Sequence, residues 1–484
     1  MTNNLVYGVH DKPKFPQMLL FAFQQVLAIL AATILVPAII GNGMSQSAAL
    51  FGAGVGTLVY QLFTKFRSPV FLGSSFAFIS SMFAAFSGAY AASRGYAGLI
   101  IGATMAGLVY VVIAIIVKFA GVKWINALMP AVVIGPTVAL IGLSLAVNAV
   151  NDLTVGKVMK DVTELVIEEV DGVATIVEKT SQVSACSPYI ALICGLITLF
   201  SIFAFSVYGK KMAKMIPFIL GILVGYAAAS VFTVIGIATN NIELQIIDFS
   251  AFASMNIFQI PDFAFVQALD GIKAVDGAFI AKVAVAYVPV AFVVFAEHIA
   301  DHKNLSSIIG SDLLEEPGLH RTLLGDGVGS IAGAFFGGCP NTTYGESVGC
   351  VAITKNASVI TITTTAIMSI VISFFGPFVT FLSSIPNCVM GGVCVALYGF
   401  IAVSGLKMIK TVNLNDSRNL FVVSAILIPG IGGLSVSFGE ITITTIACAL
   451  ILGIVANLLL NKLSVKVGVE VDGETNEPTE EEAE

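Results

Sequence analysis

The chain has 484 residues, of which 57% are hydrophobic and only 11% are charged. Soluble domains usually carry about 25% charged residues, so this composition excludes an ordinary soluble enzyme and indicates a protein that lies in the lipid bilayer. The formal net charge of −7 gives no reason to expect a nucleic-acid partner, because many of the acids lie in two segments, 150–187 and 470–484. The seven cysteines lie mostly inside apolar runs and predict no disulfide framework.

Twelve stretches have the apolarity and approximate length of a membrane-spanning helix, which needs about 20 residues. No small-residue cleavage pattern follows the first, so we interpret it as a retained span rather than a signal peptide. Two further stretches, 69–86 and 340–354, are interrupted by Gly, Pro and hydroxyl residues, and we expect them to cross as broken helices, which gives fourteen crossings. The continuous spans are 17–41, 47–64, 97–119, 125–148, 188–207, 215–238, 279–300, 320–337, 358–383, 388–406, 419–436 and 441–461.

The placement of lysine and arginine supports fourteen crossings, because these residues concentrate in cytoplasmic loops. With both termini in the cytoplasm, only six of the 23 lysines and arginines fall outside, and omitting either broken stretch would reverse the side of every later loop. We therefore predict a multi-pass protein of the cell membrane with cytoplasmic N- and C-termini. The six outer residues are Arg94, Lys157, Lys160, Lys179, Lys273 and Lys282.

The two halves of the chain repeat the same motifs in the same order. "LFGAGVGTL" (50–58) matches "LLGDGVGSI" (323–331), "SSFAF" (74–78) corresponds to "TTYGE" (342–346), and "MPAVVIGP" (129–136) matches "IPNCVMGG" (385–392). Each half holds seven crossings, and an odd number inverts the second copy relative to the first. Inverted repeats with paired broken helices are typical of secondary transporters, whose substrate binds near the bilayer midplane. The expected fold is an all-α polytopic membrane protein.

The two broken stretches supply polar groups at mid-membrane depth. A break there frees backbone N–H and C=O groups, which only protein, water or a polar ligand can satisfy. The second stretch would bring together the backbone of Tyr344 and Gly345 and the carboxylate of Glu346, and the first would place Phe76 opposite them. The residues before Gly73 and before Tyr344 are expected to form two short strands that pair. A simpler role for Glu346 is to cap its own half-helix, and this role is compatible with ligand binding.

A third set of polar residues lies at the end of a long apolar helix, in "VVFAEHIADHKN" (293–304). Glu297 and Asp301 are four residues apart and so share a helix face. An ionisable side chain as deep as Glu297 by default marks a functional site. His302, nearer the cytoplasmic end, is expected to be solvated.

Two other motifs have competing interpretations. "GAGVGT" (52–57) and "GDGVGS" (325–330) imitate phosphate-binding loops, but they lie inside spans, where small residues let helices pack closely. Asp326 in the second motif is expected near the cytoplasmic interface. "HIADH" (298–302) has the spacing of an inverted zincin helix and raises the alternative of an intramembrane metalloprotease, although only His10 and His320 remain as other histidines. We expect no metal and no cofactor.

One segment outside the spans predicts a structure of its own. "ELVIEEVDGVATIVEK" (164–179) places Asp171 and Gly172 between two β-branched runs, which is the strongest short-range signal of a β-hairpin. A disordered acidic loop is the alternative interpretation of this outer segment.

With these motifs the chain resembles the nucleobase–ascorbate transporter family, most closely its bacterial uracil-transporting members. The resemblance spans nearly the whole chain and implies a core domain and a gate domain, often in homodimers. The core would consist of 17–121 and 279–384, the gate of 122–240 and 385–462, and 463–484 would form an acidic cytoplasmic tail. The segments that stand in the family's order are "FLGSSFAFIS" (71–80), "VFAEHI" (294–299), "DLLEEPGLHR" (312–321), "PNTTYGES" (340–347) and "GCVAITK" (349–355).

The resemblance implies import of uracil with protons by alternating access. The family's uracil contacts fall on Phe76, Glu297, Gly345 and Glu346, beside Tyr344, and proton coupling is expected to involve Glu297, Asp301 and Glu346. A pyrimidine dione offers two N–H donors and two carbonyl acceptors, which suit carboxylates and backbone amides. Phe76 can cover the ring face.

Two positions depart from the family pattern. Asp301 stands where uracil permeases often have histidine, which leaves sodium open as the coupling ion, and Ser347 stands where the signature has asparagine. One alternative is a purine permease, although Glu346 favours uracil because purine-transporting members tend to have glutamine there. The other is an anion transporter or channel of the same architecture.

Overall fold

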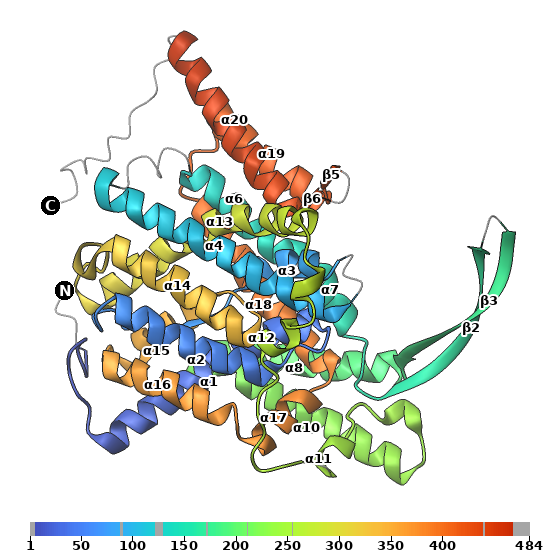
Figure 1. Ribbon diagram of the computed structural model, residues 1–484. Coiled ribbons are helices and arrows are strands. Elements are labelled where there is room, and N and C mark those ends of the chain that lie inside the picture. Colours follow the sequence, from blue (N-terminus) through green and yellow to red (C-terminus); the bar gives the residue numbers. More distant parts are fainter. Residues whose placement is uncertain are drawn as a thin grey trace.

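The computed structural model describes residues 5–87, 91–121, 129–170, 173–210, 212–253, 255–438 and 441–467 and is mostly helical (Figure 1). Seven of the described helices are long and apolar enough to cross a membrane, and shorter apolar helices accompany them, so the chain is a multi-pass membrane protein. The long ones are Phe15–Ile40, Ala92–Ala120, Ala131–Asp152, Pro188–Tyr208, Pro217–Ala238, Gly277–Ile309 and Asn387–Ile409. The shorter ones are Phe76–Phe86, Val359–Ile372, Ser417–Ile431 and Thr445–Leu460.

A first bundle joins helices from the beginning and the middle of the chain. Its members are α1 (Phe15–Ile40), α2 (Gln46–Phe63), α3 (Ile79–Phe86), α4 (Ala92–Ala120), α13 (Gly277–Ile309), α14 (Leu319–Gly337), α15 (Gly345–Thr354), α16 (Val359–Ile372) and α17 (Gly376–Ser384). Helix α14 packs against both α2 and α4, α13 packs against α4, and α16 packs against α1 and α2 (Figure 1). The two halves of the chain therefore interleave in this bundle.

A second bundle contains the remaining long helices. Its members are α6 (Ala131–Ser144), α7 (Ala146–Asp152), α8 (Pro188–Tyr208), α9 (Met212–Met215), α10 (Pro217–Ala238), α18 (Asn387–Ile409), α19 (Ser417–Ile431) and α20 (Thr445–Val467). Helix α18 packs on α6 and α8, α8 packs on α10, and α19 packs on α6 and α20. Shorter elements connect α10 of the second bundle to α13 of the first: η2 (Ile242–Leu244), α11 (Ser250–Ala253), α12 (Ala264–Ala268) and η3 (Ile272–Ala274). Another, η4 (Leu314–Gly318), connects α13 to α14.

Glycines allow the helices of the first bundle to touch through their backbones. A Cβ added to Gly52 of α2 would lie 2.4 Å from the carbonyl oxygen of Gly333 of α14, and one added to Gly56 would lie 2.7 Å from that of Gly329. No larger residue fits these contacts. The two glycine motifs of the sequence therefore serve helix packing, as predicted.

Two short strands pair inside the first bundle. β1 (Leu72–Ser74) and β4 (Asn341–Thr343) are buried and antiparallel, with Leu72 opposite Thr343 and Ser74 opposite Asn341. The Asn341 side chain also donates to the Gly52 carbonyl at 3.0 Å. The predicted strand pairing is confirmed, and it satisfies backbone groups that the helix breaks leave open.

A long hairpin projects from the helices (Figure 1). β2 (Met159–Val170) pairs antiparallel with β3 (Val173–Ser184) in a continuous register from Met159–Ser184 to Val170–Val173. The predicted hairpin is confirmed, while its turn residues, Asp171 and Gly172, lie outside the described residues. A smaller hairpin pairs β5 (Val436–Phe438) with β6 (Ile441–Ile443).

Residues 5–11 form a strap along the linker between α15 and α16, and we call this segment the N-terminal strap. The amides of Val6 and Tyr7 donate to the Lys355 carbonyl at 2.8 and 3.3 Å, and the amides of Ala357 and Val359 donate back to the strap. Lys355 ends α15 in a left-handed conformation, with φ 57°. The strap thus satisfies polar groups exposed by the helix break.

Candidate functional site

Glu346 lies in the first turn of α15, directly after the N-cap residue Tyr344 and Gly345. The N-terminal end of a helix carries a partial positive charge, which stabilises a carboxylate there. Gly345 is exposed and Glu346 is partly exposed. Backbone amide and carboxylate therefore open together onto accessible space rather than into the packed core.

The Tyr344 side chain belongs to the scaffold beneath this helix start. It is 4% exposed, and its hydroxyl donates to the Ser74 carbonyl at 2.8 Å. A Cβ added to Gly73 would lie 2.3 Å from Cε2 of the ring, so the ring fills the space left by this glycine. The ring ties β1 to the start of α15, and only the backbone of Tyr344 remains as its contribution to a ligand site.

Gln25 of α1 contacts Ser347, the residue after Glu346 on α15. Sequence reasoning did not identify Gln25. Its Nε2 donates to Ser347 Oγ at 2.5 Å and lies 3.4 Å from the Ser347 carbonyl oxygen. Both side chains are buried. The pair fixes the first turn of α15, and with it Glu346, against α1.

Glu297 lies in the C-terminal half of α13 and is exposed, although Val293 to Ala296 before it and His298 after it are buried. An exposed carboxylate among buried neighbours faces an opening in the protein. Asp301, one turn further along, accepts a hydrogen bond from Thr343 Oγ1 at 2.8 Å.

Helices α13 and α15, which carry the candidate acids, approach each other at Gly345. A Cβ added to Gly345 would lie 3.9 Å from Oδ1 of Asp301, which places α13 beside the start of α15. Glu297 lies one turn before Asp301 on α13, and Glu346 directly follows Gly345 on α15. The structure therefore brings together the three acids that the sequence predicted to work together.

Phe76 lies in the 3-10 turn η1 (Phe76–Phe78), which follows β1, and is partly exposed. Its ring meets Tyr398 of α18 edge to face, with centroids 6.3 Å apart. The Tyr398 hydroxyl has no hydrogen-bond partner among the described residues. Tyr398 is therefore an additional candidate, contributed by the second bundle, that sequence reasoning missed because no motif marks it.

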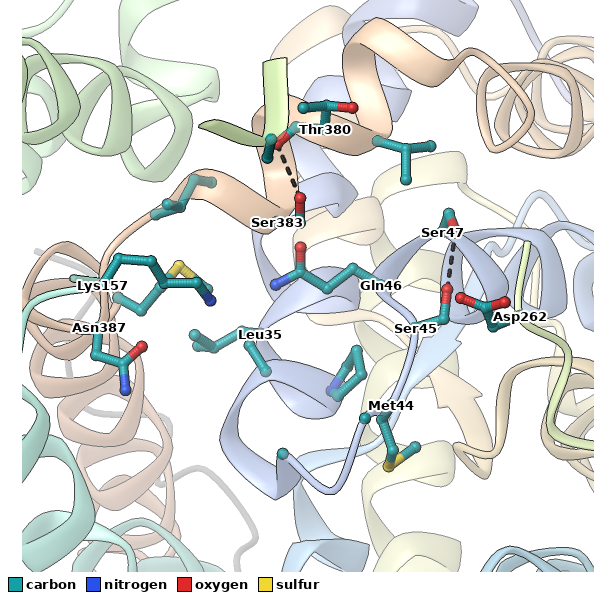
Figure 2. Close-up of a pocket in the computed structure, with 18 of the residues that line it drawn as sticks. Leu35, Met44, Ser45, Gln46, Ser47, Lys157, Asp262, Thr380, Ser383 and Asn387 are labelled. Carbon is teal, nitrogen blue, oxygen red and sulfur yellow. Dashed lines mark hydrogen bonds between the residues drawn. The ribbon is translucent and has the colours of Figure 1, made fainter. Parts of the chain in front are cut away.

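A cavity of about 790 Å³ opens where α1 ends and α2 begins (Figure 2). Gln46, Asp262, Ser383, Lys157 and Asn387 contribute polar groups to its lining. Neither Phe76, Glu297 nor Glu346 lines this cavity.

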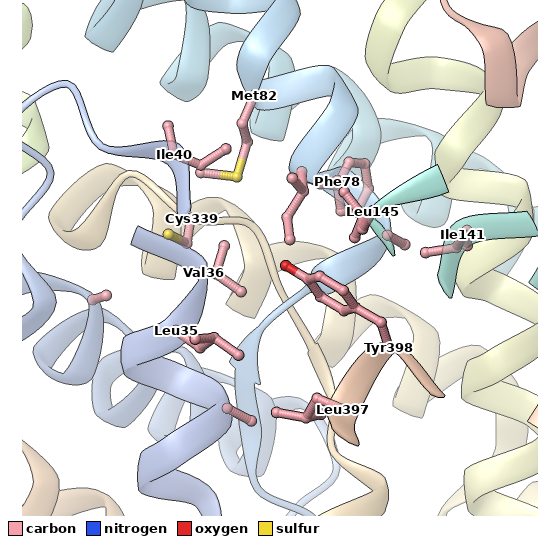
Figure 3. Packing of buried hydrophobic residues seen from close by; sticks show 14 of the residues in the cluster. Leu35, Val36, Ile40, Phe78, Met82, Ile141, Leu145, Cys339, Leu397 and Tyr398 are labelled. Carbon is pink, nitrogen blue, oxygen red and sulfur yellow. The ribbon is translucent and has the colours of Figure 1, made fainter. Parts of the chain in front are cut away.

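An apolar layer adjoins this cavity. Leu35 lines the cavity, and Figure 3 shows Leu35 and Val36 of α1 in the same cluster of buried hydrophobic residues as Leu397 and Tyr398 of α18. Because Tyr398 also contacts Phe76, the layer extends from the cavity to the aromatic ring of the candidate site.

One expectation about a neighbouring polar residue was wrong: His302 is 0% exposed, although it was expected to be solvated. Asp326 is 1% exposed, and its position near the cytoplasmic interface stays a prediction. Asp326 of α14 contacts His298 Nδ1 at 2.6 Å. Glycines on both sides of Asp326 let α14 approach its neighbours closely, and this close packing encloses the polar pair. Periodicity along a single helix carries no information about such a partner.

The geometry gives no support to the metalloprotease alternative. The ring nitrogens of His298 contact Asp326 and Thr322, and those of His302 contact the His298 carbonyl and Tyr60. Among the described residues, no group of three His, Cys, Asp or Glu side chains is arranged to hold a metal ion. All seven cysteines are free and buried.

Comparison with known proteins identifies relatives over nearly the full length. The chain is 35% identical over 461 residues to the uracil permease of Bacillus caldolyticus, covering 95% of each protein. It is 35% identical to the uracil permease of Bacillus subtilis, covering 94% of each. It is 31% identical to the uracil permease of Escherichia coli K12, also covering 94% of each.

Solved structures support the architecture at lower identity. The transmembrane domain of the cyanobacterial bicarbonate transporter BicA aligns with a TM-score of 0.58 at 14% identity, over 93% of this chain and 100% of that one. The murine Slc26a9 anion transporter in its inward-facing state aligns with a TM-score of 0.63 at 11% identity, over 94% of this chain and 69% of that one. At these identities the likeness establishes the fold alone.

The family assignment rests on a match that covers most of the chain. The model described as Permease family, Xan_ur_permease, matches residues 16–439. Together with the relatives above 30% identity, this match shows that the chain belongs to the nucleobase–ascorbate transporter family of permeases.

Proposed function

We propose that this permease imports uracil by proton symport. The observation that carries the proposal is that Glu346, at the open start of α15, lies on a helix that packs against α13, where Glu297 is exposed. Two carboxylates can accept the two N–H groups of a pyrimidine dione, and the free amides at the start of α15 can donate to its carbonyl oxygens. Phe76 would cover the ring face, with Tyr398 behind it. The names of the relatives agree with this chemistry.

The proposed topology has fourteen crossings in two inverted repeats, with both termini in the cytoplasm. We propose the first bundle as the core domain, 17–121 and 279–384, and the second as the gate domain, 122–240 and 385–462, a division that the helix packing supports. Broken crossings at 69–86 and 340–354 coincide with β1, α3, β4 and α15. The pairing of β1 with β4 supports a symmetric relation between the two breaks.

The proposed transport cycle is alternating access. In the predicted topology the 790 Å³ cavity is open to the outside, and the apolar layer containing Leu35 and Tyr398 would separate it from the site. Movement of the first bundle against the second would open a route through this layer and close the site toward the inner side. The site lies on both bundles, since Phe76 belongs to one and Tyr398 to the other.

Proton coupling is assigned to Glu297, Asp301 and Glu346. Carboxyl groups that share one accessible site can exchange protons with water and with each other. Asp301 accepts a hydrogen bond from Thr343 of β4. Protonation of Asp301 can therefore influence the broken segment. Sodium is the alternative coupling ion, because an aspartate also suits a hard cation.

The test is uptake of labelled uracil by the purified protein in liposomes, under imposed proton or sodium gradients. We expect saturable uptake that an inward proton gradient drives and that unlabelled uracil blocks. Blockage by xanthine but not by uracil would indicate a purine permease. Non-saturating flux, or bicarbonate or chloride transport without uracil uptake, would indicate a channel or anion transporter, a function suggested by the names of the structural neighbours.

A further inference from the structure

The acids of α13 alternate with histidines in a fixed pattern. Glu297 and Asp301 are each followed by a histidine, His298 and His302, which lie about 100° further around the helix. The acids are exposed or partly exposed, whereas both histidines are completely buried. One face of α13 therefore reaches the site, and the adjacent face is anchored in the first bundle.

His298 anchors α13 to α14 through both ring nitrogens. Nδ1 lies 2.6 Å from Asp326 Oδ2, and Nε2 lies 3.0 Å from Thr322 Oγ1. Asp326 and Thr322 are four residues apart on the same helix and so form one clamp. A ring held at both edges cannot turn, and α13 cannot rotate about its axis at this level without breaking a buried bond.

His302 anchors α13 to α2. Its Nδ1 lies 2.8 Å from the His298 carbonyl oxygen, which can only accept, so Nδ1 carries the hydrogen. Its Nε2 lies 2.7 Å from the Tyr60 hydroxyl, which donates to Ser68 Oγ at 2.8 Å. The two imidazoles also stack, with centroids 4.0 Å apart.

We propose that His298 and His302 are positioning residues that set the direction of the Glu297 and Asp301 side chains toward the site. The proposal rests on the proposed function in that Glu297 must face a substrate. Rotation of α13 by half a residue would swing both acids by about 50°, far more than a hydrogen-bonded ligand tolerates. The clamps by α14 and α2 prevent this rotation.

The most conservative probes remove one bond at a time. Tyr60→Phe removes the hydroxyl that contacts His302 Nε2, and Thr322→Val removes the hydroxyl that contacts His298 Nε2. The matched control is Tyr287→Phe, also in the first bundle, because the buried Tyr287 hydroxyl has no hydrogen-bond partner among the described residues. His302→Gln, which keeps a polar side chain, is compared with His302→Leu, which does not.

Two measurements on the purified full chain distinguish positioning from simple stability. The first is modification of Glu297 by a water-soluble carbodiimide, followed by mass spectrometry, which needs no substrate. The second is the Kd of labelled uracil for folded protein, measured beside the thermal midpoint. We expect Tyr60→Phe and Thr322→Val to change the labelling rate and to raise Kd about 3- to 10-fold. Tyr287→Phe should stay within about twofold of wild type in both measurements, and His302→Gln should recover much of what His302→Leu loses.

Unchanged labelling and Kd in both single-bond variants, with only a lower thermal midpoint, would overturn the proposal and reduce the histidines to structural anchors. Wild-type protein that fails to bind uracil would instead refute the proposed function. In that case the carbodiimide comparison still decides whether the histidines direct Glu297.

Discussion

Glu346 combines a helix N-terminal position with direct access to the site, so its substitution by glutamine tests ligand recognition with little change in shape. Gln replaces one of two acceptors by a donor that faces a substrate N–H. An unpaired buried donor costs about 1–3 kcal/mol, or roughly 5- to 150-fold in affinity. We expect this loss in the Kd of uracil for purified Glu346→Gln protein, with wild-type thermal stability. Binding as tight as wild type would remove Glu346 from the site.

Glu297 differs from Glu346 because it lies on a continuous helix, four residues before Asp301. Its proposed task is to carry the proton. Glu297→Gln cannot change protonation, so it should retain part of its uracil binding but lose accumulation against a gradient. Uptake into liposomes with and without a proton gradient measures the difference. A variant that still concentrates uracil would transfer the coupling role to Asp301 or Glu346.

At the scale of elements, the tie between β1 and α15 depends on Gly73. Its missing side chain makes room for the Tyr344 ring, which Ser74 holds in place. Gly73→Ala should therefore displace the start of α15, costing about 1–3 kcal/mol through overpacking and weakening uracil binding. The control is Gly349→Ala in the middle of α15, where an added Cβ meets nothing within 4 Å and helix propensity improves. Equal effects of the two substitutions on the thermal midpoint and on Kd would contradict this account.

Element types were largely predictable, and element ends were less so. Apolar length predicted the long helices, and β-branched runs around Asp171 and Gly172 predicted the β2–β3 hairpin. The predicted span 358–383 is two helices, α16 and α17, which separate just before Gly376. Helix α13 continues to Ile309, beyond the predicted end at 300, because polar residues there are anchored by neighbouring elements.

At the scale of the whole molecule, the predicted orientation can be tested because all seven native cysteines are buried. Lys160 of β2 and Lys303 of α13 are both exposed and lie on opposite sides in the predicted topology. We expect Lys160→Cys to react with an impermeant maleimide in intact cells, and Lys303→Cys to react only after permeabilisation. The reverse labelling pattern would contradict the predicted topology and would show that the 790 Å³ cavity opens to the inner side.

The candidate acids could be recognised from sequence because a charge inside an apolar span is costly and therefore conspicuous. The residues that hold these acids in place could not be recognised from sequence. Gln25, Tyr60 and Thr322 are ordinary polar residues whose partners lie on other helices. Their role becomes visible only when the bundle brings those helices together. The same holds for Tyr398, whose free hydroxyl is defined by what surrounds it.

The N-terminal strap has a consequence for biosynthesis. Its partner, the linker after α15, lies roughly 350 residues later in the chain, so the strap remains unpaired while the first half of the protein inserts. Docking of the strap must be a late event, since contacts of such long sequence separation close slowly. In ribosome-bound chains that end before residue 340, the strap should be cleaved rapidly by added protease, and protection should arise only after residues 355–359 have emerged. Protection of a segment at the start of the chain would then report that synthesis has passed the linker after α15.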